Sequence, residues 1–122
     1  MTKTILMVDD SQFTLDIFSF AIQAAGYNIL TAQNGLEALE ILQKNKVDLL
    51  VVDVNMPVMD GYTLTRKVRE MPDLAEKPVI IMTTLKESKD KEKGYAAGAD
   101  LYMIKPVHPD EMVDQIKLFV GE

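Results

Sequence analysis

Short apolar runs alternate along this chain with longer segments whose apolar residues recur at helical spacing. The runs are rich in Val, Ile, Leu and Met, a composition that predicts strands. They lie at residues 4–8, 27–32, 48–52, 79–82 and 101–104. Most of them carry apolar residues at successive positions, which predicts strands buried on both faces. The second run has fewer aliphatic residues, so we expect it at an edge of the sheet.

A segment with helical periodicity follows each strand. These segments begin near residues 11, 34, 61, 86 and 109. In the second segment, Leu36, Leu39 and Leu42 fall on one side, and we expect this side to face the core. The fourth segment is nearly all charge and has few residues to bury. We therefore expect it to be the most weakly packed helix.

The strict alternation of strands and helices predicts an α/β fold, a doubly wound, five-stranded parallel sheet with helices on both faces and right-handed crossovers. At 122 residues, we expect one domain that spans residues 1–122. The net charge of -6 argues against sequence-independent nucleic-acid binding, which needs a basic surface. The chain has no Cys and no apolar run near roughly 18 residues, so we expect a cytoplasmic protein without a membrane partner.

Four of the five expected strands end in polar residues. Asp9 and Asp10 follow the first strand, Asp53 the third, Thr83 the fourth and Lys105 the fifth. The carboxyl ends of parallel strands meet at one edge of a sheet, where such folds bind ligands. Three carboxylates within about 5 Å would repel by roughly 3 kcal/mol per pair at an effective dielectric constant near 20, so this edge requires a cation. Mg²⁺ with oxygen ligands, together with Lys105, would supply the positive charge.

Several short motifs occur along the chain in a fixed order. They are Asp9-Asp10-Ser11, Asp53, Asn55-Met56-Pro57-Val58-Met59-Asp60-Gly61, Thr83, Gly98-Ala99-Asp100 and Lys105-Pro106. Together they resemble the receiver domain of two-component response regulators, most closely its stand-alone, CheY-like type. The resemblance covers the whole chain and implies a flavodoxin-like fold with strand order 2-1-3-4-5. It also implies a cis peptide bond between Lys105 and Pro106.

The same resemblance implies roles for single residues. Asp53 would accept a phosphoryl group, and the Thr83 hydroxyl and the Lys105 amine would contact the phosphoryl oxygens. Tyr102 would be the aromatic side chain that turns inward when the domain switches. The Mg²⁺ ligands would be the carboxylates of Asp9, Asp10 and Asp53 and the backbone carbonyl of Asn55.

We interpret the chain as a phosphorylation-dependent signalling switch and not as a metabolic enzyme. Its expected partners are a histidine kinase or histidine phosphotransfer protein that supplies the phosphoryl group, and a downstream protein target. One alternative is a small Mg²⁺-dependent phosphohydrolase, which would need a second Asp where Asn55 stands. Another is a flavin- or nucleotide-binding module, which would need a Gly-rich or Ser/Thr-rich phosphate loop where Asp9 and Asp10 stand.

The first helix carries a second apolar stripe beside the one that faces the core. Phe13, Ile17, Phe20 and Ala24 form this stripe on nearly the opposite side of the helix. One interpretation is that the last helix covers it, because helices of such sheets pack side by side. The other is that it stays exposed and marks a partner site. On that second interpretation, Phe13 and Ile17 contact the phosphodonor protein or a second copy of this chain.

Overall fold

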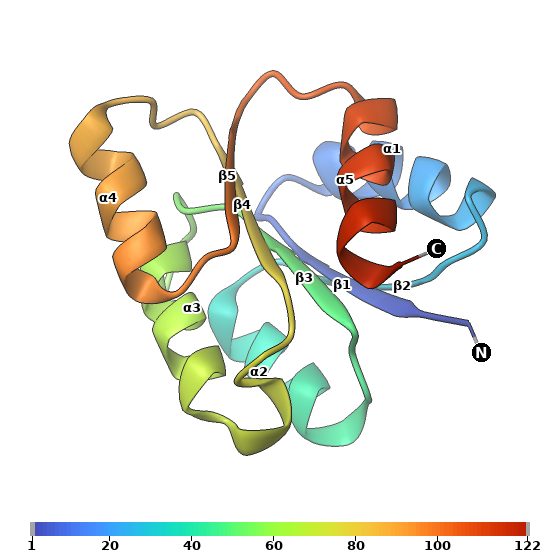
Figure 1. Ribbon diagram of the computed structural model, residues 1–122, viewed down its shortest axis with the longest axis horizontal. Helices are drawn as coiled ribbons and strands as arrows, with labels where there is room; N and C mark the ends of the chain where they lie inside the picture. Colours follow the sequence, from blue (N-terminus) through green and yellow to red (C-terminus); the bar gives the residue numbers. More distant parts are fainter. Residues whose placement is uncertain (1, 122) are drawn as a thin grey trace.

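The computed structural model describes residues 2–121 and has the expected α/β architecture (Figure 1). All strand pairs are parallel, and the order in the sheet is β2-β1-β3-β4-β5. This confirms the fold class, the strand order and the edge position of the second strand. The elements are β1 (Thr4–Val8), α1 (Gln12–Ala24), β2 (Asn28–Ala32), α2 (Gly35–Lys44), β3 (Leu49–Val52), α3 (Gly61–Glu70), the short 3₁₀ helix η1 (Pro72–Leu74), β4 (Val79–Thr83), α4 (Ser88–Ala97), β5 (Leu101–Ile104) and α5 (Pro109–Val120).

Helices cover both faces of the sheet. Helices α1 and α5 lie on one face, and α2, α3 and α4 lie on the other (Figure 1). Successive side chains of a strand point to opposite faces, so each central strand contributes to two apolar cores. In β3, for example, Val51 belongs to the core under α1 and α5, and Val52 to the core under α2 and α3. Within residues 2–121, no helix is long and apolar enough to span a membrane.

The orientation of α2 differs from the expected one. Leu42 is buried as expected, but Leu36 is 50% exposed, and Ala38 is fully buried in its place. At 100° per residue, Leu36 lies about 120° from Leu42 around the helix, whereas Ala38 lies only about 40° from it. The prediction that Leu36 faces the core was therefore wrong, because the helix turns its small Ala38 toward the sheet.

Helix α4 has the weak packing that its charged sequence predicts. Gly94 and Ala97 are its buried residues, and neither has a large side chain. The neighbouring strand β5 is at the other edge of the sheet, and Tyr102 is its one buried residue. This side of the molecule therefore has much less apolar contact than the side around β1 and β3, whose residues are almost completely buried.

Candidate functional site

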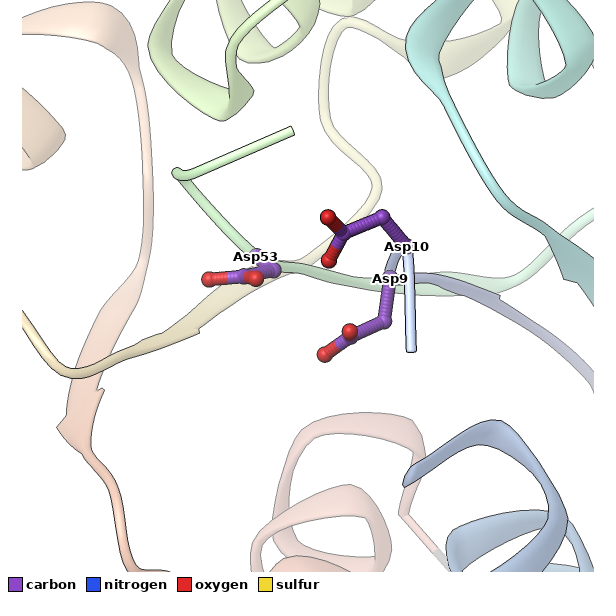
Figure 2. A group of neighbouring side chains, drawn as sticks. All are labelled: Asp9, Asp10 and Asp53. Carbon is purple, nitrogen blue, oxygen red and sulfur yellow. The ribbon is translucent and has the colours of Figure 1, made fainter. Parts of the chain in front are cut away.

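The carboxyl ends of β1 and β3 bring three aspartates together. Val8 and Val52 are paired in the sheet, so Asp9 and Asp53 follow at the same level, and the Asp53 N–H donates to the Val8 carbonyl at 2.9 Å. Asp10 is the next residue of the β1–α1 loop. One carboxylate oxygen from each aspartate lies within 4.8 Å of the others. Figure 2 shows the three side chains gathered at the ends of the two strands.

Lys105 supplies positive charge to this cluster from the end of β5. Its Nζ lies 2.9 Å from Asp9 Oδ2 and 3.6 Å from Asp53 Oδ2. Its backbone N–H donates to the Thr83 carbonyl at 2.8 Å, which fixes the end of β5 beside that of β4. The Lys105–Pro106 peptide bond is cis, as the family resemblance implies. The Lys105 ammonium group thus contacts two of the three carboxylates, those of Asp9 and Asp53.

The environment of Asp53 raises the pKa of its carboxyl above the ordinary 3.8. Burial is the largest cause; the charge of Lys105 lowers the pKa, and that of Asp9 raises it again. Backbone N–H groups of Val54 and Asn55 lower it by smaller amounts. Because the raising effects dominate, Lys105 alone does not compensate the buried negative charge.

The donor atoms of the cluster fit Mg²⁺. All are oxygens, which Mg²⁺ prefers, and three carboxylates leave room for the waters that this ion keeps. Asp9 is buried and already bonded, since its Oδ1 accepts from the Ser11 N–H at 2.9 Å and its Oδ2 from Lys105. Asp10 and Asn55 are exposed at the mouth of the site. The cluster can therefore take up a divalent ion from solvent.

Thr83 and Tyr102 lie on the side of the site toward α4. Thr83 is fully buried, and its hydroxyl oxygen accepts from the Leu85 N–H at 3.4 Å. The Tyr102 ring is turned inward and 8% exposed, and its hydroxyl donates to the Leu85 carbonyl at 2.8 Å. Both residues thus bond the same peptide segment of the β4–α4 loop.

Two residues beside the acceptor gain a role from the structure: Gly61, which sequence reasoning placed in a motif without a role, and Tyr62, which it missed. Gly61 packs so closely that a Cβ there would overlap the carbonyl oxygen of Asp53, which explains the glycine. Tyr62 follows it, and the Tyr62 hydroxyl donates to the Asp90 carbonyl in α4 at 3.0 Å. An aromatic residue at the start of an expected helix was the available signal, but its partner 28 residues away could not be read from the pattern.

The second stripe of α1 is exposed. Phe13 is 75%, Phe20 77% and Ile17 40% exposed, so α5 does not cover them. Phe13 and Ile17 line a mostly apolar groove of ≈ 490 Å³, which Lys105 and the residues after it complete on the other side. The groove therefore reaches Lys105, whose amine contacts Asp9 and Asp53.

Comparisons with known proteins agree with this geometry. The family model described as the response regulator receiver domain matches residues 5–117. The chain is 29% identical to the polar-differentiation response regulator DivK of Brucella anthropi, over 100% of this chain and 99% of DivK. It is 40% identical to the probable transcriptional regulator ycf29 of Porphyra purpurea, over 96% of this chain but only 56% of that longer protein. Among solved structures, the chemotaxis protein CheY4 of Vibrio cholerae has a TM-score of 0.93 and 34% identity, with 98% and 99% of the two chains covered.

Proposed function

This chain belongs to the response regulator receiver domain family, and from that premise we propose that it is a Mg²⁺-dependent signalling switch that accepts a phosphoryl group on Asp53. The observation that carries the proposal is the meeting of three carboxylates within 4.8 Å with the Lys105 amine. A cluster with this excess of negative charge suits a divalent ion and a transferred phosphoryl group better than it suits a purely structural role.

In the proposed reaction, an Asp53 carboxylate oxygen attacks the phosphorus of a phosphohistidine on a partner protein. The P–N bond breaks as the P–O bond forms, and the histidine nitrogen leaves with the electron pair. Lys105, already beside Asp53, neutralises a phosphoryl oxygen, and the Thr83 hydroxyl donates to another. Asp9, Asp10, Asp53 and the Asn55 backbone carbonyl would hold Mg²⁺, which would supply further neutralisation of the phosphoryl charge.

We propose that residues 1–122 act as one receiver domain in the cytoplasm. The phosphodonor would be a histidine kinase or a histidine phosphotransfer protein, and the phosphorylated domain would change its affinity for a downstream protein target. Hydrolysis of the phosphorylated Asp53, which removes the phosphoryl group again, would use the same residues. The alternative of a phosphohydrolase finds less support, because Asn55 stands where a second carboxyl group would have to act as acid and base.

The exposed stripe of α1 supports a docking place for the phosphodonor protein. Phe13 and Ile17 lie along the groove that ends at Lys105, so a helix seated there could present its phosphohistidine to Asp53. Replacing both with Ser should slow transfer from a cognate protein donor by roughly tenfold or more, the loss expected when interface anchors are truncated. Phosphorylation by acetyl phosphate should stay near normal. If the double substitution slowed phosphorylation by both donors equally, or by neither, the stripe would have a structural role. If it instead dissociated a dimer, the stripe would be the contact with a second copy of this chain.

The direct test of the phosphoacceptor role is intact-mass spectrometry after incubation with Mg²⁺ and acetyl phosphate. We expect the mass of the protein to rise by one phosphoryl group, and we expect EDTA, which removes Mg²⁺, to prevent this rise. A protein that stays unmodified with both reagents present would contradict the proposed function.

A further inference from the structure

Helix α4 is held mainly by hydrogen bonds that side chains of other elements donate to backbone carbonyls of α4 and the segments flanking it. The Tyr102 hydroxyl bonds the Leu85 carbonyl at 2.8 Å, before the helix begins. The Tyr62 hydroxyl bonds the carbonyl of Asp90 in the first turn at 3.0 Å. At the other end, Arg69 Nε bonds the carbonyl of Gly98 at 2.9 Å. Since α4 buries no large apolar side chain, these bonds largely decide where it lies.

The two ends of α4 are held with different strength. Arg69 also forms an ion pair with Asp100 at 2.7 Å and bonds the Lys77 carbonyl at 2.6 Å. This group of charge-assisted bonds fixes the end of α4 and the start of β5 to α3. Among the described residues, the side chains of other elements that donate to the beginning of α4 and the segment before it are two neutral tyrosines. The first turn is therefore the end that can move, and Gly98 marks the pivot.

Tyr62 connects this movable end to the acceptor. It is the second residue of α3, directly after Gly61, whose N–H bonds the Val54 carbonyl at 3.0 Å and whose backbone packs on Asp53. Figure 1 shows α3 beside α4, and the two helices are in contact. Tyr62 therefore reaches from the start of α3, beside Asp53, to the first turn of α4.

The tyrosine hydroxyls also complete a path from Thr83 to α4. The Leu85 N–H bonds the Thr83 hydroxyl, and the Leu85 carbonyl accepts from Tyr102. The Tyr102 and Tyr62 hydroxyl oxygens lie 3.4 Å apart, and Tyr62 then donates to the Asp90 carbonyl. Helix α4 can lie this close to the path because residue 94 is Gly, since a Cβ there would come within 2.7 Å of the Tyr102 ring.

We propose that Tyr62 is a positioning residue of the switch, which couples the state of Asp53 and Thr83 to the first turn of α4. This coupling rests on the proposed function, whereas the hydrogen bond by which Tyr62 holds α4 does not depend on it. If the Thr83 hydroxyl turns to a phosphoryl oxygen, Leu85 loses a partner, and the path through Tyr102 and Tyr62 carries the change to α4. Arg69 keeps the far end in place, so that α4 responds by pivoting.

The first experiment measures amide hydrogen exchange of the ligand-free protein. Tyr62→Phe keeps the ring and removes the hydroxyl, and Tyr95→Phe, on the exposed side of α4, is the matched control. Exchange in residues 86–94 should quicken by about fivefold in Tyr62→Phe, the size that one hydrogen bond supports, and stay unchanged in Tyr95→Phe. The segment 97–100 should not respond in either variant. Unchanged exchange in residues 86–94, a uniform rise over the whole domain, or loss of folding in Tyr62→Phe would overturn the proposal.

The second experiment separates coupling from simple support. Beryllofluoride with Mg²⁺ stands in for the phosphoryl group, and the change in exchange of residues 86–94 on its addition is compared among the three proteins. The change should fall at least threefold in Tyr62→Phe and persist in wild type and Tyr95→Phe. An undiminished change in Tyr62→Phe would overturn the coupling. If wild type itself shows no response to beryllofluoride, the proposed function and the coupling both fail, and the first experiment alone decides whether Tyr62 holds α4.

Discussion

The aspartate cluster and helix α4 lie on the same domain but are stabilised in different ways. The cluster stands on β1 and β3, central strands whose side chains are almost completely buried. Helix α4 lies against an edge strand and buries only small residues. It depends on single hydrogen bonds from tyrosines at its beginning and on Arg69 at its end. Burial fixes positions much more firmly than a few partly exposed hydrogen bonds do. The fold thus holds the aspartate cluster firmly, whereas few buried contacts hold α4.

The largest expected effect comes from changing the rigid region. Asp53→Asn should abolish phosphoryl uptake from acetyl phosphate, because the amide is nearly the same size as the carboxylate but is no nucleophile toward phosphorus. Intact mass checks the uptake, and circular dichroism checks that the fold is kept. Full phosphorylation of the variant would show that another residue is the acceptor, and the aspartate cluster would then not be the reacting region that we compare with α4.

A smaller effect should follow from removing one metal ligand. Asp10→Ala should weaken Mg²⁺ binding by roughly tenfold or more, because the cluster loses one of three carboxylates and Asp10 has no buried packing to lose. Asp73→Ala, an exposed aspartate on η1, is the matched control. Titration calorimetry of both variants measures the affinity. Equal Mg²⁺ affinity in wild type and Asp10→Ala would rule out the carboxylate cluster as the metal site.

The smallest effect concerns stability and pH. The pKa of Asp53 is raised above 3.8, so the folded protein binds this proton more tightly than the unfolded chain, and the ionised carboxylate destabilises the fold at neutral pH. Without Mg²⁺, Asp53→Asn should therefore raise the free energy of unfolding at pH 7 by on the order of 1 kcal/mol. The gain should shrink as pH falls through the raised pKa and vanish below about 3.8. Urea unfolding at several pH values measures it, and a gain that grew toward acid pH would have the wrong sign.

The rigid region could be predicted from sequence far better than the movable one. Continuous apolar runs fix the buried strands, and the polar residues that end them, such as Asp53 and Lys105, must meet at one edge of a parallel sheet. The rotation of a helix about its axis is decided by tertiary packing, which is why Leu36 was placed wrongly. The contact of Tyr62 with α4 joins two helices through one hydroxyl, and no periodic pattern encodes it.

The most direct test of this account is amide hydrogen exchange of the wild-type protein with and without phosphorylation, in the presence of Mg²⁺. If the phosphoryl group on Asp53 acts through the weakly held side of the domain, the change in exchange should concentrate in residues 84–105, which contain α4 and β5. The amides of β1 and β3 should stay equally protected in both states. A response spread evenly over the domain, or one centred on β1 and β3, would contradict the account.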